Sequence, residues 1–161
     1  MEEKTYTLSQ AQTHFAVDFH TKTWELLEKP TRTGEENERM IDYAHASLAH
    51  WRAAGTAARH QRGEWLLSRV YAVLGDAPHA LRHASRCMEI LESNQAEMAD
   101  FDFAFAYEAL ARAYAVAEKQ TEAKNFLELA KKAGEVIAEA DDRQVFFDEL
   151  NGGQWHGVHV S

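Results

Sequence analysis

Charged and aromatic residues recur at matched positions of two predicted helices. The first helix is predicted from Thr56 to Leu74, and its apolar face is centred on Leu67. At about 100° per residue, the side opposite Leu67 carries Arg62, Trp65 and Arg69. The matching residues 43 positions later are Phe105, Glu108 and Arg112. An aromatic ring beside guanidinium groups suits a carboxylate, a phosphate or a peptide terminus, so these six residues are candidate ligand-binding residues.

The same charges also fit a simpler interpretation, in which this side of both helices is a solvated surface. Glu108 and Arg112 are four residues apart and would pair within one helix, which stabilises a helix by only tenths of a kcal/mol. This interpretation accounts for the charges well. It accounts poorly for a tryptophan at position 65 on an outward face.

Nine histidines raise the question of a metal site. His79 and His83 share a helix face, but the run HALRH lacks the glutamate that follows the first histidine of a zinc protease motif. We therefore interpret them as surface histidines and assign no metal ligands. His45 lies beside the apolar face of a predicted helix and can reach the edge of the candidate surface, so we add it to the candidate ligand-binding residues.

Motifs for catalysis are missing from the sequence. The chain has neither a phosphate-binding glycine loop nor a G-x-S-x-G nucleophile motif. Cys87, the single cysteine, lies on an apolar stripe between Ala84 and Leu91 and is predicted to be a core residue. We therefore assign no catalytic residue and no cofactor.

A helical hairpin from Arg62 to Leu91 positions the first set of candidates. Gly75 suits the position that ends a helix, and Pro78 suits the first turn of the next. The pattern then recurs with the same offset of 43 residues. The residues Leu67, Tyr71, Ala80, Ala84 and Cys87 are echoed by Leu110, Tyr114, Ala123, Leu127 and Ala130.

This pattern resembles the tetratricopeptide repeat, in which a first helix with Leu, a small residue and Tyr precedes a second helix with Ala. The two copies read Glu64-x-x-Leu67-Ser68-x-x-Tyr71…Ala80-x-x-x-Ala84 and Tyr107-x-x-Leu110-Ala111-x-x-Tyr114…Ala123-x-x-x-Leu127. The tryptophan is one place late, the closing proline is missing, and the period exceeds the 34 residues of that family. Stretches such as RGEW also resemble an uncharacterised bacterial family of small proteins of this kind. The resemblance implies a right-handed stack of hairpins whose first helices line a concave groove, with the six candidates in it.

The remaining pattern predicts an all-α domain of about seven helices over residues 1–161, with loose tails at 1–8 and 152–161. Helix starts are expected at Ser9, Thr33, Thr56, Asp102, Thr121 and Asp141, besides the helix that begins near Pro78. Helices one and two match the repeat poorly, and we interpret them as an atypical first hairpin.

Composition limits the function. The 161 residues carry a net charge of −9, which argues against nucleic acid as a partner because phosphates would be repelled. We find neither a secretory signal nor a membrane span in the sequence, and a lone cysteine fits a reducing cytoplasm.

The leading functional hypothesis is a cytoplasmic module that binds a peptide or partner protein in the concave groove and performs no chemistry. In it, Arg69 and Arg112 hold an anionic group, so replacing either weakens binding without unfolding the protein. A second hypothesis is a small-molecule sensor or an enzyme using Glu64 and His45 with the charged candidates. A third is a homo-oligomer in which the tail Gln154–Ser161 of another copy fills the groove.

Overall fold

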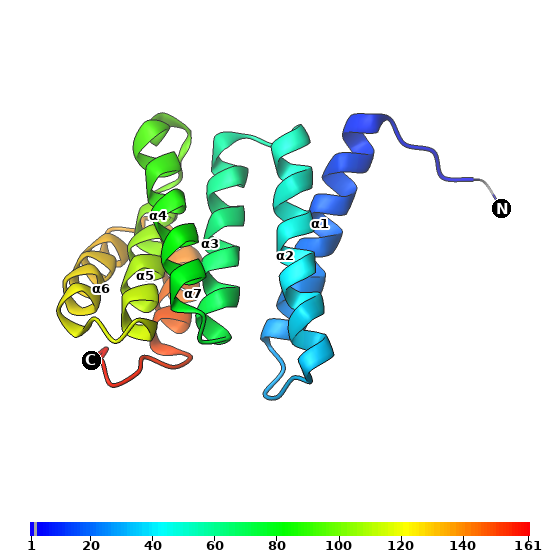
Figure 1. The fold of residues 1–161 in the computed structure, drawn as a ribbon. Coiled ribbons are helices and arrows are strands. Elements are labelled where there is room, and N and C mark those ends of the chain that lie inside the picture. The colour runs from blue at the N-terminus through cyan, green and yellow to red at the C-terminus, as the bar shows by residue number, and fades with distance from the viewer. Residues whose placement is uncertain (2) are drawn as a thin grey trace.

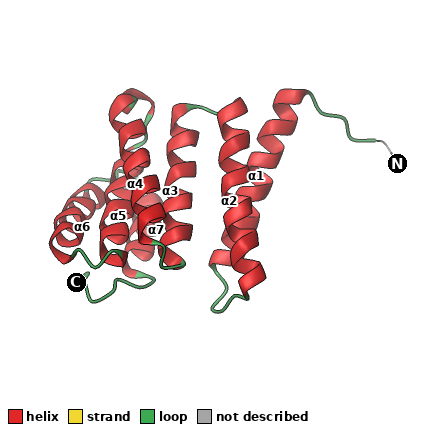
Figure 2. Ribbon diagram, in the orientation of Figure 1, coloured by secondary structure: helices red, strands yellow, loops and turns green. Residues whose placement is uncertain are grey.

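The computed structural model describes Met1 and residues 3–161, and it is helical throughout (Figures 1 and 2). The helices are α1 (Leu8–Leu27), α2 (Gly34–Ala54), α3 (Ala57–Val73), α4 (Ala77–Ser93), α5 (Asp100–Val116), α6 (Gln120–Glu135) and α7 (Ala140–Asn151), with a short 3-10 turn η1 (Gln95–Glu97). No strand occurs within the described residues. The predicted all-α class and the seven helices are confirmed.

Several helix starts follow the predicted capping chemistry. The Thr33 hydroxyl accepts the Glu36 N–H, and the Glu36 carboxylate accepts the Thr33 N–H, as the capping-box spacing predicted. Thr56 caps α3 as predicted. The prediction of Ser9 as the first cap was wrong, because the same reciprocal pair forms two residues earlier, between Thr7 and Gln10.

The last three helices begin earlier than predicted. Asp102, Thr121 and Asp141 do not precede their helices; α5 starts at Asp100, α6 at Gln120 and α7 at Ala140. The Asp102 carboxylate instead accepts the N–H of Ala99, so it caps α5 from inside the first turn. The carboxylates of Asp102 and Asp141 lie in the first turns of α5 and α7, where the positive end of the helix dipole favours a negative charge.

Consecutive helices pair as three hairpins, α1 with α2, α3 with α4, and α5 with α6. The hairpins lie in a row, with α2 against α3 and α5 against both α3 and α4, and α7 packs on α5 and α6 (Figure 1). This order is compatible with the predicted right-handed stack of hairpins.

The predicted equivalence of two hairpins holds for the aromatic residues at their centre. Tyr71 stacks on His83 with 5.5 Å between ring centroids and 2° between planes. Tyr114 stacks on Phe126, 43 positions later, with 5.6 Å and 4°. Ala80 and Ala123 are both fully buried between their helices.

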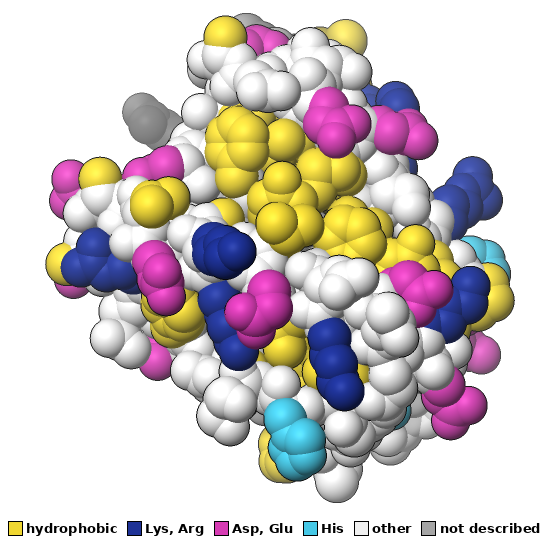
Figure 3. All heavy atoms as spheres, turned by 90° about the vertical axis from the view of Figure 1, so that its left-hand side faces the viewer, with side chains coloured by type: hydrophobic (Ala, Val, Ile, Leu, Met, Phe, Trp, Pro, Cys, Tyr) yellow, Lys and Arg dark blue, Asp and Glu magenta, His cyan; other side chains and the backbone are white. Residues whose placement is uncertain are grey.

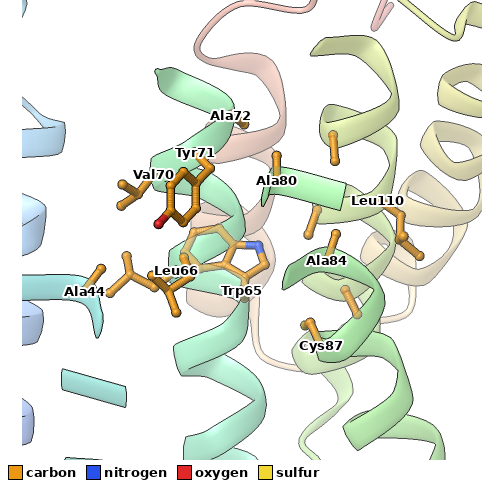
Figure 4. Packing of buried hydrophobic residues seen from close by; sticks show 14 of the residues in the cluster. Ala44, Trp65, Leu66, Val70, Tyr71, Ala72, Ala80, Ala84, Cys87 and Leu110 are labelled. Atoms are coloured by element: carbon orange, nitrogen blue, oxygen red, sulfur yellow. The ribbon is translucent and has the colours of Figure 1, made fainter. Parts of the chain in front are cut away.

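Helix α5 is the centre of the packing because its small side chains allow neighbours on every side. Its buried alanines are Ala104, Ala106, Ala109, Ala111, Ala113 and Ala115. One apolar cluster joins α5 to α2, α3 and α4, and part of it is drawn in Figure 4. A second joins α5 to α6, α7 and the C-terminal segment. Phe105 contacts both clusters, through Trp65 on one side and Phe146 on the other.

The C-terminal segment is not the loose tail that the sequence predicted. Trp155 and Val158 are buried in the second cluster, and the Trp155 indole donates to the carbonyl of Leu150 at 2.9 Å. At the end of the molecule formed by α6 and the C-terminus, hydrophobic side chains form a band between charged residues (Figure 3). Among the described residues, no helix is both long and apolar enough to cross a membrane.

Equivalent turns end α3 and α5, but with different residues in the left-handed conformation. Gly75 has φ of 75°, and the Asp76 N–H donates to the carbonyl of Tyr71. Glu118, 43 positions later, has φ of 59° in the same hydrogen-bonding pattern. A side chain in this conformation costs about 1–2 kcal/mol, which glycine avoids.

We therefore expect Glu118→Gly to raise the free energy of unfolding by about 1 kcal/mol, measured by urea denaturation. Glu118→Ala is the control, because alanine keeps the strained Cβ and should give no comparable gain. An equal gain in both variants would show that the glutamate charge, not the backbone, causes the effect.

Cys87 is fully buried, as the apolar stripe predicted, and burial raises the pKa of its thiol. We expect the native protein to react slowly with an aromatic disulfide reagent and the urea-unfolded protein to react at once. Rapid stoichiometric labelling of the native protein would contradict this burial.

Candidate functional site

A pocket lies where the first helices of all three hairpins meet α7. Its volume is about 210 Å³. The lining residues are His20 and Trp24 of α1, Gln61, Arg62 and Trp65 of α3, Phe101, Asp102 and Phe105 of α5, and Val145 and Glu149 of α7. We call it the aromatic pocket. Val145 is 60% exposed, so the pocket is reached from solvent past α7.

The aromatic walls of the pocket are fixed by contacts with one another. Trp24 stacks on Trp65 at 5.9 Å between centroids, and Phe105 meets Trp65 edge-on at 5.3 Å. The indole of Trp65 donates to the Glu108 carboxylate at 3.1 Å. Trp65 is therefore buried and held at both its ring face and its N–H, rather than standing outward on an open surface.

Arg62 stands at the rim with its charge already paired. Its guanidinium donates twice to the Asp102 carboxylate, at 2.8 and 2.9 Å, and lies over the ring of Phe101. The bidentate geometry is the strong form of this ion pair. On the opposite wall, burial and the charge of Arg59 lower the pKa of His20, which favours its neutral form. The pocket is thus apolar inside, with a neutralised ion pair at its edge.

Gln61 leaves one polar atom of this region without a partner. Its side-chain N–H₂ donates to the Cys87 sulfur at 3.2 Å and to the Asp102 carbonyl at 3.4 Å. Its Oε1 is buried and accepts no hydrogen bond within the described residues. Leaving such an acceptor unsatisfied costs about 1–3 kcal/mol.

Arg112 is buried, not exposed on a groove wall, with only 2% of its surface accessible. Its guanidinium donates to the Glu108 carboxylate at 2.5 Å and to the carbonyls of Glu149 and Gly152 at 2.9 and 3.0 Å. It also lies 4.2 Å from the ring centre of Trp155. A fourth hydrogen bond, to the Gln154 carbonyl at 3.4 Å, also goes to its own chain.

Arg69 is held in the same region. Its Nε lies 2.7 Å from a Glu149 carboxylate oxygen, an ion-pair distance without a well-aligned hydrogen bond. Burial, and after it the nearby charge of Arg112, lowers the pKa of Arg69. Gly153 passes between the two arginines with φ of 70°, and a Cβ there would lie within 3.0 Å of both guanidiniums.

These contacts correct the expectation that the guanidiniums of Arg69 and Arg112 stand free on an open groove wall, although both residues line a cavity of about 330 Å³ together with Arg32. The two positions do lie side by side, as their equivalence predicted. At the C-terminal end of α7, the buried Arg112 guanidinium donates to the carbonyls of Glu149 and Gly152. The chain's own segment after α7 therefore occupies the part of the groove that another copy's tail was expected to fill.

The residues of the enzyme or sensor hypothesis do not form one site. Glu108, Arg69 and Arg112 belong to the buried network under α7, and Arg62 lies at the aromatic pocket. Glu64 and His45 lie on the other side of α3, in a cavity that faces α2 and α4. Among the described residues, no three histidine, cysteine, aspartate or glutamate side chains are grouped as a metal site requires.

Sequence reasoning placed Arg62, Trp65 and Phe105 together correctly but missed the seven other residues that line the pocket. These residues are His20, Trp24, Gln61, Phe101, Asp102, Val145 and Glu149. Trp24 lies 43 positions before Leu67, which was a signal for its place on the first helix of a hairpin. The others carried no signal, since a long-range ion pair such as Arg62 with Asp102 leaves no periodic pattern.

We expect Arg112→Ala to lower the free energy of unfolding by about 3–5 kcal/mol, because it leaves Glu108 as a buried charge without its partner. The measurement is urea denaturation followed by circular dichroism. The control is Arg39→Ala, whose exposed pair with Glu35 is worth less than about 1 kcal/mol. Equal midpoints for the two variants would show that the network does not stabilise the fold.

Comparison with known proteins gives no further constraint on the site. No protein-family model, curated protein or solved structure matches the chain. The functional argument therefore rests on the geometry of these residues.

Proposed function

We propose that this protein is a binding module of the tetratricopeptide kind that holds one apolar side chain of a peptide or partner protein in the aromatic pocket. The observation that supports it is the pocket itself, placed where α1, α3 and α5 converge. Its walls are four aromatic rings, and it reaches solvent beside Val145.

The size of the pocket favours a side chain over a free metabolite. Its volume of about 210 Å³ exceeds the roughly 150 Å³ of an engineered cavity that holds benzene. It falls below the range of about 300–1,000 Å³ typical of small-molecule sites. One aromatic ring or one large aliphatic side chain fits this space, and the rest of its chain would lie outside.

The charges around the pocket favour a neutral occupant. Arg62 is bound to Asp102, and Arg69 and Arg112 are paired with Glu149 and Glu108. An anionic group is therefore a weaker candidate for this pocket than a neutral aromatic side chain, which can stack on its rings.

The test is a peptide-display selection against the intact protein, followed by titration of a selected peptide and detection by tryptophan fluorescence. Trp24 and Trp65 report directly on the pocket because both rings line it. We expect selected peptides to share one aromatic or large aliphatic residue. Replacing that residue of a selected peptide by alanine should abolish the fluorescence change.

Val145→Trp tests the location of binding, because a larger side chain at this exposed position obstructs the pocket entrance without removing core contacts. We expect it to weaken peptide binding at least tenfold, about 1.4 kcal/mol, the loss expected when an anchoring residue is displaced. The matched control is Val136→Trp, since Val136 is also exposed but does not line the pocket. Equal affinities for the two variants would place the peptide elsewhere, and an empty selection would contradict the proposal.

A further inference from the structure

A second cavity lies on the opposite side of α3, between α2 and α4, and its volume is about 650 Å³. Its lining residues are His45, Leu48 and Arg52 of α2, Glu64 and Tyr71 of α3, and His79, Arg82, His83, Arg86 and Glu89 of α4. We call it the arginine–histidine cavity. Three arginines and three histidines meet here in a chain whose net charge is −9.

A buried carboxylate organises the floor of this cavity. Glu64 is almost fully buried and accepts hydrogen bonds from Arg52 at 2.9 Å and from a His83 ring nitrogen at 2.6 Å. These contacts hold His83 and Arg52 in place and pair the negative charge of Glu64. The floor is therefore a built arrangement of charged groups, not a set of independent surface side chains.

Aromatic rings form one wall. Tyr71 stacks between His79 and His83, at 4.8 and 5.5 Å between centroids. The Tyr71 hydroxyl makes a 2.9 Å hydrogen bond with a His45 ring nitrogen. In Figure 4 the Tyr71 hydroxyl points away from α4 towards α2. This wall offers hydroxyl and imidazole hydrogen-bonding groups to an occupant.

The charges that face the cavity leave a positive excess. Arg52 is matched by Glu64, and Arg86 is paired with Glu89 at 3.1 Å on the exposed rim. Arg82 makes no salt bridge within the described part of the chain. An exposed pair such as Arg86 with Glu89 is weak, so an anion can displace Glu89 at little cost.

We propose that the arginine–histidine cavity binds a small organic oxyanion, held by Arg82 and Arg86 beside Tyr71. Guanidinium groups recognise phosphate and carboxylate oxygens through paired hydrogen bonds. The volume lies inside the range of small-molecule sites, unlike that of the aromatic pocket. This site uses α2 and α4, which do not line the aromatic pocket, so the inference does not rest on the proposed peptide binding.

The experiment is an NMR titration of the ¹⁵N-labelled full chain with two probes, inorganic phosphate and malonate, at pH 7 and constant ionic strength. We expect saturable shifts of the amides from His79 to Glu89 with at least one probe. Tighter binding of phosphate assigns a phosphoryl ligand, and tighter binding of malonate assigns a carboxylate ligand. Unsaturable shifts spread over the whole surface with both probes would overturn the proposal.

Variants of exposed residues separate specific binding from charge screening. The double variant Arg82→Gln/Arg86→Gln should weaken binding at least tenfold, the loss expected when a charge-assisted hydrogen bond is removed. The control Arg39→Gln removes an exposed arginine of α2 outside the cavity and should bind normally. Glu89→Gln should strengthen binding because it frees Arg86, a gain that misfolding does not produce. Equal weakening by the double variant and the control, or no gain from Glu89→Gln, would contradict the site.

Discussion

The arrangement of the C-terminal third depends on the need to satisfy one buried guanidinium. Arg112 lies on α5, which packs against α3, α4, α6 and α7, and removing its charge from water is favourable only if it is well paired and hydrogen-bonded. Glu108 supplies one partner from the same helix, and α7 and the chain after it supply carbonyl oxygens. The carbonyls of Glu149 and Gly152 both lie at the C-terminal end of α7, where the Glu149 carbonyl also accepts the Gly152 N–H at 3.2 Å. Two unfavourable groups, a buried cation and the open end of a helix, thus satisfy each other.

This interaction determines which part of the surface of α3 and α5 is covered by α7 and the chain after it. Because Arg112 and Arg69 hold the end of α7 against α3 and α5, the segment with Trp155 packs over Arg112. Both arginines still line a cavity of about 330 Å³ with Arg32 and Gly153. The aromatic pocket stays open between α1 and the middle of α7.

Much of this architecture could be predicted, because local chemistry and periodicity carry it. The offset of 43 residues placed Arg69 beside Arg112 and Trp65 beside Glu108, and the Thr33–Glu36 pair marked a helix start. What covers a helix face is not a local property. Nothing in α5 indicates that α7 will lie across it. The sequence therefore predicted Arg112 on the wall of a groove and residues 152–161 as a loose tail. Both predictions were wrong because they depend on contacts between distant parts of the chain.

Helix α3 shows why the polar cavity escaped sequence analysis. Glu64 and Trp65 are neighbours, and both are buried, because rotation of about 100° turns one towards α4 and the other towards α1 and α5. An amphipathic pattern separates a helix into a buried and an exposed side, and it assigns charged residues to the exposed side. A helix enclosed on nearly all sides breaks this rule, and its buried charges must find partners on other helices. Glu64 finds Arg52 and His83 there, so a buried charge of α3 anchors the floor of the arginine–histidine cavity.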